Sequence, residues 1–171
     1  PVEYLPGKEC SGIKKFLSEI VEKDDLPVIQ EFVGFGLYRQ YFIKKALILV
    51  GEPNTGKTTL LRILHAFFGK ENMSGVSLQR LSNNRFSSAD LYSKLINTWD
   101  DLSVGDVNDT GTFKIVTGGG LITAEQKFKS QFQFENYAKL IFACNKIPDV
   151  KETSDDAYFS RWIVVRFNRQ I

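Results

Sequence analysis

Residues 51–58 read Gly51-Glu52-Pro53-Asn54-Thr55-Gly56-Lys57-Thr58 and fit the pattern G-x-x-x-x-G-K-T. In this pattern a glycine-rich loop wraps around phosphate groups and presents backbone N–H groups to them. Residues 46–50 before the loop are all apolar, which predicts a buried strand. Residues 59–68 after it have apolar side chains at helical spacing, and Gly69 is a typical residue just beyond a helix end. Strand, loop and helix in this order indicate a phosphate-binding site rather than a chance glycine turn.

The loop residues have distinct expected roles. Gly51 and Gly56 lack a Cβ atom, so the backbone can approach phosphate closely. We expect Lys57 to contact the β- and γ-phosphates of a nucleotide and the Thr58 hydroxyl to reach Mg²⁺. The expected nucleotide-binding residues are Gly51, Glu52, Pro53, Asn54, Thr55, Gly56, Lys57, Thr58 and Thr59.

Composition narrows the class of protein. The 171 residues suffice for one hydrophobic core, and 43% hydrophobic content is typical of a soluble globular domain. No apolar run approaches the ~18 residues of a membrane span. The net charge of +2 means that any contact with nucleic acid needs a local basic patch. The sequence has no signal peptide, and it begins at Pro1 rather than at a Met, so we expect a fragment of a longer protein.

Helical and strand-like segments alternate along the chain, which favours an α/β fold with a mostly parallel central sheet. Helices are expected from Ile13, capped by Ser11, and from Asp25 to about Tyr41. We therefore expect a helical N-terminal segment over residues 1–40, packed on a core over residues 41–171. Further strands are expected at 74–81, 95–99, 140–144 and 162–165, and short helices at 88–94, 109–116 and 155–161.

An acidic pair, Asp100 and Asp101, closes an apolar segment downstream of the loop. A carboxylate there can hold Mg²⁺ opposite Thr58, and a second one can orient or deprotonate the attacking water. We assign Asp100 to the metal and Asp101 to the water, and the exchanged assignment stays open. The alternative is that these aspartates only cap a helix or turn.

Asn145 follows the predicted strand 140–144. Ligands of open α/β sheets bind at the carboxyl ends of the strands, so this amide is expected to fix the γ-phosphate or the lytic water. The alternative is an Asn in a turn before Pro148. The guanine-binding pattern N-K-x-D is not met, because Pro148 stands where Asp is needed, and a GTPase is therefore disfavoured.

These sites, in this order, resemble those of the superfamily III helicases. More closely, they are similar to the C-terminal ATPase of phage and plasmid primase-helicases and of the poxvirus primase-helicase. The resemblance rests on residues 34–37, 51–59, 100–101, 113–128, 140–148 and 159–162. The chain departs from the family where Trp99 precedes the acidic pair and where Asp101 replaces a frequent Glu, which leaves the roles of the two aspartates open.

The resemblance implies an AAA+-like P-loop core that uses ATP and Mg²⁺. It also implies a homo-oligomeric ring, typically a hexamer, that moves 3′ to 5′ on single-stranded DNA and shares each active site between two subunits. A primase domain usually lies upstream in the same full-length chain. The implied setting is a viral, phage or plasmid replication protein in the cytoplasm of its host cell.

Residues 126–135 have a pattern that favours a DNA contact. Lys127 and Lys129 fall on one face of an extended segment, with phenylalanines on the other. A hairpin turning near Ser130 would bring both lysines near its tip, and in the resembling family a hairpin at this place reaches into the ring channel. We therefore expect both lysines to contact single-stranded DNA. The alternative is an edge strand whose solvated lysines prevent aggregation.

Arg161 precedes the last predicted strand, in the segment that resembles the arginine-bearing segment of the family. Its guanidinium is expected to reach the γ-phosphate of a neighbouring subunit and to stabilise the transition state there. The alternative is a surface salt bridge to Asp155 or Asp156. Other basic candidates for the role in the neighbouring site are Lys44, Lys45 and Arg166.

Two other functions compete with a helicase motor. One is a nucleotide-gated ATPase that binds DNA or assembles partners without unwinding. The other is a small-molecule P-loop kinase, which needs a lid rich in arginines. Residues 105–137 contain no arginine, which disfavours the kinase.

Overall fold

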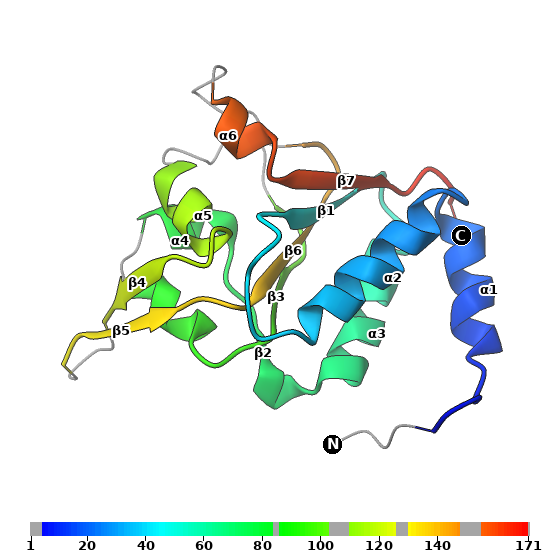
Figure 1. The fold of residues 1–171 in the computed structure, drawn as a ribbon. Coiled ribbons are helices and arrows are strands. Elements are labelled where there is room, and N and C mark those ends of the chain that lie inside the picture. The colour runs from blue at the N-terminus through cyan, green and yellow to red at the C-terminus, as the bar shows by residue number, and fades with distance from the viewer. Residues whose placement is uncertain (1–4, 84–85, 103–109, 126–129, 148–154, 171) are drawn as a thin grey trace.

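The computed structural model describes residues 5–83, 86–102, 110–125, 130–147 and 155–170 (Figure 1). At its centre lies a five-stranded sheet in the order β2-β3-β6-β1-β7, and every neighbouring pair is parallel. The strands are β1 (Ala46–Val50), β2 (Met73–Ser74), β3 (Ile96–Trp99), β6 (Lys139–Cys144) and β7 (Trp162–Arg166). This confirms the predicted α/β fold with a parallel central sheet.

Helices cover both faces of the sheet (Figure 1). On one face lie α1 (Ser11–Ile20), α2 (Asp25–Gly36) and α3 (Lys57–Phe68), which share a hydrophobic cluster with Leu47 and Leu49 of β1. On the other face lie α4 (Leu78–Asn83), the 3-10 turn η2 (Ser87–Leu91) and α5 (Thr110–Val116), which pack with Ile48 and Val50. Side chains alternate along β1, so each face of the sheet has its own core.

A hairpin and two short helical elements complete the described part of the chain. The strands β4 (Leu121–Ala124) and β5 (Phe132–Glu135) pair as an antiparallel hairpin beside α5. The helix α6 (Asp156–Phe159) precedes β7, and the 3-10 turn η1 (Lys70–Asn72) follows α3. A hairpin over this region was predicted, but Lys127 and Lys129 lie outside the described residues. No helix in the described part of the chain has the length and hydropathy of a membrane span.

The two N-terminal helices differ in detail from the expectation. Ser11 is the first residue of α1 rather than its cap, and no side chain caps that end. The helix α2 ends at Gly36, before the predicted end near Tyr41. Its last turn tightens, since Leu37 N donates to Gly34 O at 3.1 Å, and two glycines lower helix propensity there.

The predicted strand at 74–81 is wrong beyond its first residue. The cause is Asn97, which is fully buried in β3. Its side chain accepts a hydrogen bond from Val76 N at 2.8 Å and donates one to Val76 O at 2.9 Å. These bonds replace strand pairing, and the chain then turns into α4, where Ser77 Oγ accepts from Arg80 N at 3.2 Å.

The remaining short helices are placed correctly but with other bounds. The segment predicted as 88–94 is the 3-10 turn η2, and α6 is shorter than the predicted 155–161. Asp155 caps α6 by accepting a hydrogen bond from Tyr158 N at 3.0 Å. The helix predicted from Asp109 is α5 from Thr110 onward, and Asp109 itself lies outside the described residues.

A buried lysine ties the N-terminal helices to the sheet. Lys139, at the start of β6, is fully buried and its ammonium lies 4.4 Å from the centre of the Phe35 ring. It donates hydrogen bonds to the carbonyl oxygens of Tyr38, of Gln40 at 3.0 Å and of Tyr137 at 2.8 Å. Burial lowers the pKa of Lys139 to about 8. The segment after α2 is thereby fastened across the amino end of the sheet.

Candidate nucleotide-binding site

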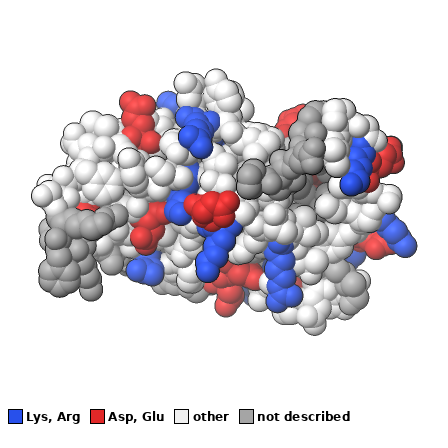
Figure 2. Space-filling model, turned by 90° about the horizontal axis from the view of Figure 1, so that it is seen from below, with Lys and Arg blue, Asp and Glu red and all other residues white. Residues whose placement is uncertain are grey.

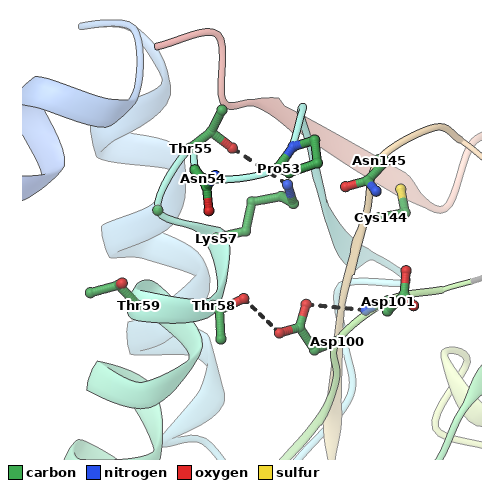
Figure 3. Close-up of a pocket in the computed structure, with 11 residues that line it drawn as sticks. Pro53, Asn54, Thr55, Lys57, Thr58, Thr59, Asp100, Asp101, Cys144 and Asn145 are labelled. Carbon is green, nitrogen blue, oxygen red and sulfur yellow. Dashed lines mark hydrogen bonds between the residues drawn. The ribbon is translucent and has the colours of Figure 1, made fainter. Parts of the chain in front are cut away.

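A cavity of about 460 Å³ opens at the carboxyl ends of β1, β3 and β6 (Figure 3). Figure 3 shows the loop between β1 and α3 on one side and the acidic pair on the other. The cavity is lined by Pro53, Asn54, Thr55, Gly56, Lys57, Thr58, Thr59, Asp100, Asp101, Cys144 and Asn145. The fold therefore brings most of the predicted site residues to one place.

The loop is closed by its own lysine. Lys57 is only 7% exposed, and its Nζ donates to the carbonyl oxygens of Gly51 at 2.6 Å and Glu52 at 2.8 Å. Thr55 Oγ1 also donates to Glu52 O, at 2.8 Å. Gly56 has φ 92°, a left-handed conformation that suits glycine. The ammonium is thus held inside the curve of the loop, where a phosphate chain would meet it.

Gly51 also has a reason to be glycine that the sequence does not show. A Cβ atom at this position would collide with the Phe167 carbonyl oxygen, which follows β7. Phe167 N donates to Val50 O at 2.7 Å, which holds the two segments together. Packing inside the protein therefore requires glycine at 51, independently of any ligand.

Thr58 and Asp100 meet across the cavity. The Thr58 hydroxyl donates a hydrogen bond of 2.7 Å to Asp100 Oδ2 (Figure 3). A hydroxyl and a carboxylate are the oxygen donors that Mg²⁺ takes from proteins when a bound phosphate supplies further ligands. No cluster of three His, Cys, Asp or Glu side chains occurs among the described residues, and the remaining ligands of a magnesium ion here would be phosphate oxygens and water. The donor set fits Mg²⁺ bound together with a nucleotide.

Asp101 and Asn145 lie at the same end of the cavity. Asp101 has φ 62°, an uncommon conformation for a residue other than glycine. Its backbone N–H donates to Asp100 Oδ1 at 3.1 Å, while Figure 3 shows its side chain on the side of Cys144 and away from Thr58. Burial raises the pKa of the Cys144 thiol to about 11, so this residue lines the cavity as a neutral group. The geometry separates a carboxylate that is bonded to Thr58 from one that lies on the side of Cys144.

Arg161 lies at the opposite end of the sheet from this cavity. Its carbonyl oxygen accepts from Ala46 N at 2.8 Å, at the start of β1, whereas the loop follows the end of β1. A five-residue strand spans about 16 Å at 3.3 Å per residue. Arg161 is therefore not placed to act on the loop of its own chain.

The guanidinium of Arg161 contacts the end of α5. Its Nη1 donates to Thr117 Oγ1 at 3.0 Å and its Nε to Ala157 O at 3.2 Å. Within the described part of the chain it forms no ion pair with Asp155 or Asp156. Asp155 instead pairs with Lys114 at 2.7 Å, and this bond lowers the pKa of the Asp155 carboxyl to about 2. The side chain of Lys45 donates to Ser160 O, next to Arg161.

A second cavity, of about 500 Å³, lies on the β7 side of the loop. It is lined by Val50, Gly51, Glu52, Thr55, Asn145, Arg166, Phe167, Asn168 and Gln170. Asn168 and Gln170 were not predicted as site residues, because the irregular segment after β7 carries no motif. Only the three-dimensional course of the chain places them beside the loop.

Charges are mixed on the surface that Figure 2 shows. Lysine and arginine side chains lie among aspartates and glutamates, and the described residues in this view form no broad patch of one sign. This agrees with the small net charge of +2. A contact with nucleic acid would have to be local.

Comparison with known proteins identifies relatives of this fold. Residues 49–161 match a family described as a family of unknown function (DUF5906). A candidate helicase of Acanthamoeba polyphaga mimivirus, L207/L206, is 28% identical over 127 residues, which are 70% of this chain and 13% of that protein.

Two solved structures share the fold. The C-terminal region of NrS-1 superposes with a TM-score of 0.69 at 24% identity, over 98% of this chain and 39% of that one. The JCV helicase, solved with a small molecule bound, superposes with a TM-score of 0.60 at 18% identity, over 88% of this chain and 43% of that one. The chain thus spans less than half the length of each of these relatives.

Proposed function

The chain belongs to DUF5906, a family of unknown function, and we propose that it is the ATP-hydrolysing motor of a replicative DNA helicase. The proposed type is a superfamily III helicase of the primase-helicase kind, which moves on single-stranded DNA as a ring. In this proposal residues 1–40 form a helical segment packed on the ATPase domain of residues 41–171. A primase domain belongs to the same full-length chain, which acts in the host cell of a virus, phage or plasmid.

The observation that carries the proposal is the hydrogen bond from Thr58 to Asp100 across the cavity. It joins the phosphate-binding loop to a carboxylate from another strand, which is the pairing that holds Mg²⁺ in P-loop ATPases. MgATP, when bound, supplies the γ-phosphoryl group whose transfer to water releases the free energy. Lys57 would hold the β- and γ-phosphates, while Thr58 and Asp100 would hold the metal.

Asp101 and Asn145 are the residues proposed to act on the attacking water. Asp101 lies apart from Thr58 and beside Cys144, the residue before Asn145 (Figure 3). A carboxylate free of the metal can orient or deprotonate the attacking water, and the Asn145 amide can hold that water or a γ-phosphate oxygen. The geometry favours the assignment of Asp100 to the metal and Asp101 to the water.

A site shared between subunits is supported by the position of Arg161. It lies at the end of the sheet away from the loop, so it can complete only the site of another subunit. An arginine that enters from a neighbour stabilises the charge that develops on the γ-phosphate in the transition state. Lys44 and Lys45 lie on the same side and are further candidates.

The DNA part of the proposal is supported by the names of the relatives, since the mimivirus protein and the JCV protein are both called helicases. The hairpin of β4 and β5 fits the predicted position of a DNA-contacting element. Lys127 and Lys129 are proposed as the contacts.

The rate of ATP hydrolysis, measured against protein concentration with and without single-stranded DNA, tests the proposal. A ring with shared sites predicts that activity per subunit rises with concentration and that DNA stimulates it. An assembly ATPase without unwinding would show the concentration dependence, but single-stranded DNA would not stimulate it. Activity that is absent under all these conditions would contradict both functions.

A further inference from the structure

Two hydrogen bonds join the helix after the phosphate-binding loop to the strand before the acidic pair. The Thr58 hydroxyl of α3 donates to Asp100 Oδ2 at 2.7 Å (Figure 3). Farther along the same helix, His65 Nε2 and Thr98 Oγ1 are hydrogen-bonded at 2.8 Å. The first bond lies in the proposed metal site. Neither His65 nor Thr98 lines the cavity, so the second bond needs another explanation.

The spacing of the four residues makes these bonds two successive links between one helix and one strand. Thr58 and His65 are two turns apart, about 10.5 Å along α3, and therefore lie on the same side of the helix. Thr98 in β3 and Asp100 just after it are two positions apart, so an extended chain presents both on one face. The later helix residue meets the earlier strand residue, which is the order that an antiparallel helix and strand require.

Thr98 is a polar residue in apolar surroundings. It is 6% exposed and shares its face of β3 with the fully buried Ile96, which belongs to the cluster under α1, α2 and α3. Its neighbour in β6 is Ile141. A hydroxyl buried in such a place costs free energy unless it is hydrogen-bonded, and His65 supplies the bond. Valine would fill the same volume without a partner, so packing alone does not call for this pair.

The bond from His65 acts on the position of Asp100. Pairing with β6 fixes β3 within the sheet, and beyond the acidic pair Leu102 N donates to Ala143 O at 2.8 Å. These contacts do not set the distance from β3 to α3, which carries Thr58. A hydrogen bond between Thr98 and α3 does so directly, two residues before Asp100. Mg²⁺ tolerates little displacement of its ligands, so this distance matters for a metal site.

We propose that His65 is a positioning residue of the metal site, an inference that rests on the proposed function. Through Thr98 it holds Asp100 opposite the Thr58 hydroxyl, so that both oxygen donors are in place when Mg²⁺ enters with the nucleotide. His65 itself contacts neither the nucleotide nor the metal.

The affinity for ADP with and without Mg²⁺ tests this role without any turnover. Dissociation constants are measured by titration calorimetry in Mg²⁺ and in EDTA, and their ratio is the gain in affinity that the metal brings. His65→Ala removes the imidazole from an exposed position, and Thr98→Val replaces the hydroxyl by a methyl group of similar size. The double variant combines the two changes. Thr98→Ser, which keeps the hydroxyl, is the matched control.

His65→Ala and Thr98→Val should each lower the metal-dependent gain about fivefold, the equivalent of one net hydrogen bond. Their affinity for ADP in EDTA should stay within about twofold of wild type, because the phosphate-binding loop is unchanged. The double variant should lose no more than either single variant, since both changes remove the same bond. Thr98→Ser should behave like wild type.

Single variants that keep the wild-type gain would show that the bond contributes only to stability. A double variant whose loss is the product of the two single losses would show that the residues act separately, and an equal fall in Mg²⁺ and in EDTA would place the effect in the loop. Each of these results overturns the positioning role and leaves the proposed function standing. A wild-type protein that binds no ADP, or binds it equally with and without Mg²⁺, overturns the proposed site and this inference with it.

Discussion

Lys57 is bound by the loop itself and is also the cation expected to contact phosphate. Its ammonium is satisfied by the carbonyl oxygens of Gly51 and Glu52, so its charge is not left buried without partners. A phosphate that enters the loop offers the same ammonium stronger, charge-assisted hydrogen bonds. The hydrogen bonds of this lysine join the two ends of the loop and support its curve.

Replacing Lys57 by Ala should abolish ATP turnover and weaken nucleotide binding, because the β- and γ-phosphates lose their cation. The measurements are steady-state ATPase rate and calorimetric affinity for ADP. Lys70→Ala, which removes an exposed lysine just after α3, is the matched control and should behave like wild type. Wild-type turnover in a correctly folded Lys57→Ala protein would refute the proposed site.

Variants of Asp100 and Asp101 should differ in the Mg²⁺ concentration that they need for ATP hydrolysis. Asp100→Asn should raise the Mg²⁺ concentration needed for activity, because the residue that accepts from Thr58 loses its charge. Asp101→Asn should leave that dependence unchanged and lower turnover by about 10²–10⁴, the range for a positioned base. ATPase rates measured across a Mg²⁺ titration test this assignment. If Asp101→Asn needs more Mg²⁺ and Asp100→Asn does not, the roles of the two aspartates are exchanged.

Among the elements, β6 begins with the buried Lys139, and this residue makes the free energy of unfolding depend on pH. The pKa of Lys139 falls from 10.5 to about 8 on folding because burial disfavours the charged form. Above pH 8 the unfolded chain keeps a proton that the folded chain has released, so the free energy of unfolding rises with pH. Below pH 8 both states hold the proton, and this contribution is constant.

Denaturant unfolding at pH 8 and pH 9.5 should reveal the Lys139 contribution. The free energy of unfolding of wild type, relative to that of Lys139→Met, should rise by about 1.5 kcal/mol between these values. Methionine keeps much of the volume but cannot titrate, so it isolates the proton. Parallel changes in both proteins would show that the lysine is charged in the folded state across this range.

Sequence reasoning succeeded for elements whose pattern is local. The buried strand 46–50 and the helix after the loop were predicted because their apolar residues and the Gly69 stop are contiguous. It failed at 74–81, because the bonds from Asn97 to Val76 cross between distant segments. Asn168 and Gln170 were missed for the same reason, since only the pairing of β7 with β1 brings them to the loop.

The hairpin offers a test of the DNA-binding proposal. Lys127→Ala with Lys129→Ala should weaken binding of single-stranded DNA and reduce the slope of log affinity against log salt by roughly 1.4, at about 0.7 per phosphate contact. The matched control is Lys14→Ala with Lys15→Ala, which removes two exposed lysines from α1 and the same charge. If the slope of log affinity against log salt is equal in the two double variants, Lys127 and Lys129 are solvated lysines of an edge strand and do not contact DNA.

At the scale of the whole molecule, the sheet separates the two parts of the proposed shared site. The loop, Asp100 and Asn145 lie at the carboxyl ends of the strands, while Arg161 lies beside the amino end of β1. A ring that stacks these opposite ends against each other would complete one site at each interface. Arg161 would then exchange its bond with Thr117 for a γ-phosphate of the neighbour.

Arg161→Ala should therefore leave ATP binding largely intact, because the phosphate-binding loop supplies the ground-state contacts, but cut turnover by about 10³–10⁵. Mixing it with Lys57→Ala subunits gives the sharper test, since each variant alone is expected to be inactive. At some mixed interfaces an intact loop meets an intact arginine, and hydrolysis should return there. If the mixture stays inactive although mass measurements confirm subunit exchange, Arg161 does not act on a neighbour. Normal hydrolysis by Arg161→Ala alone would instead mean that its bond with Thr117 is purely structural.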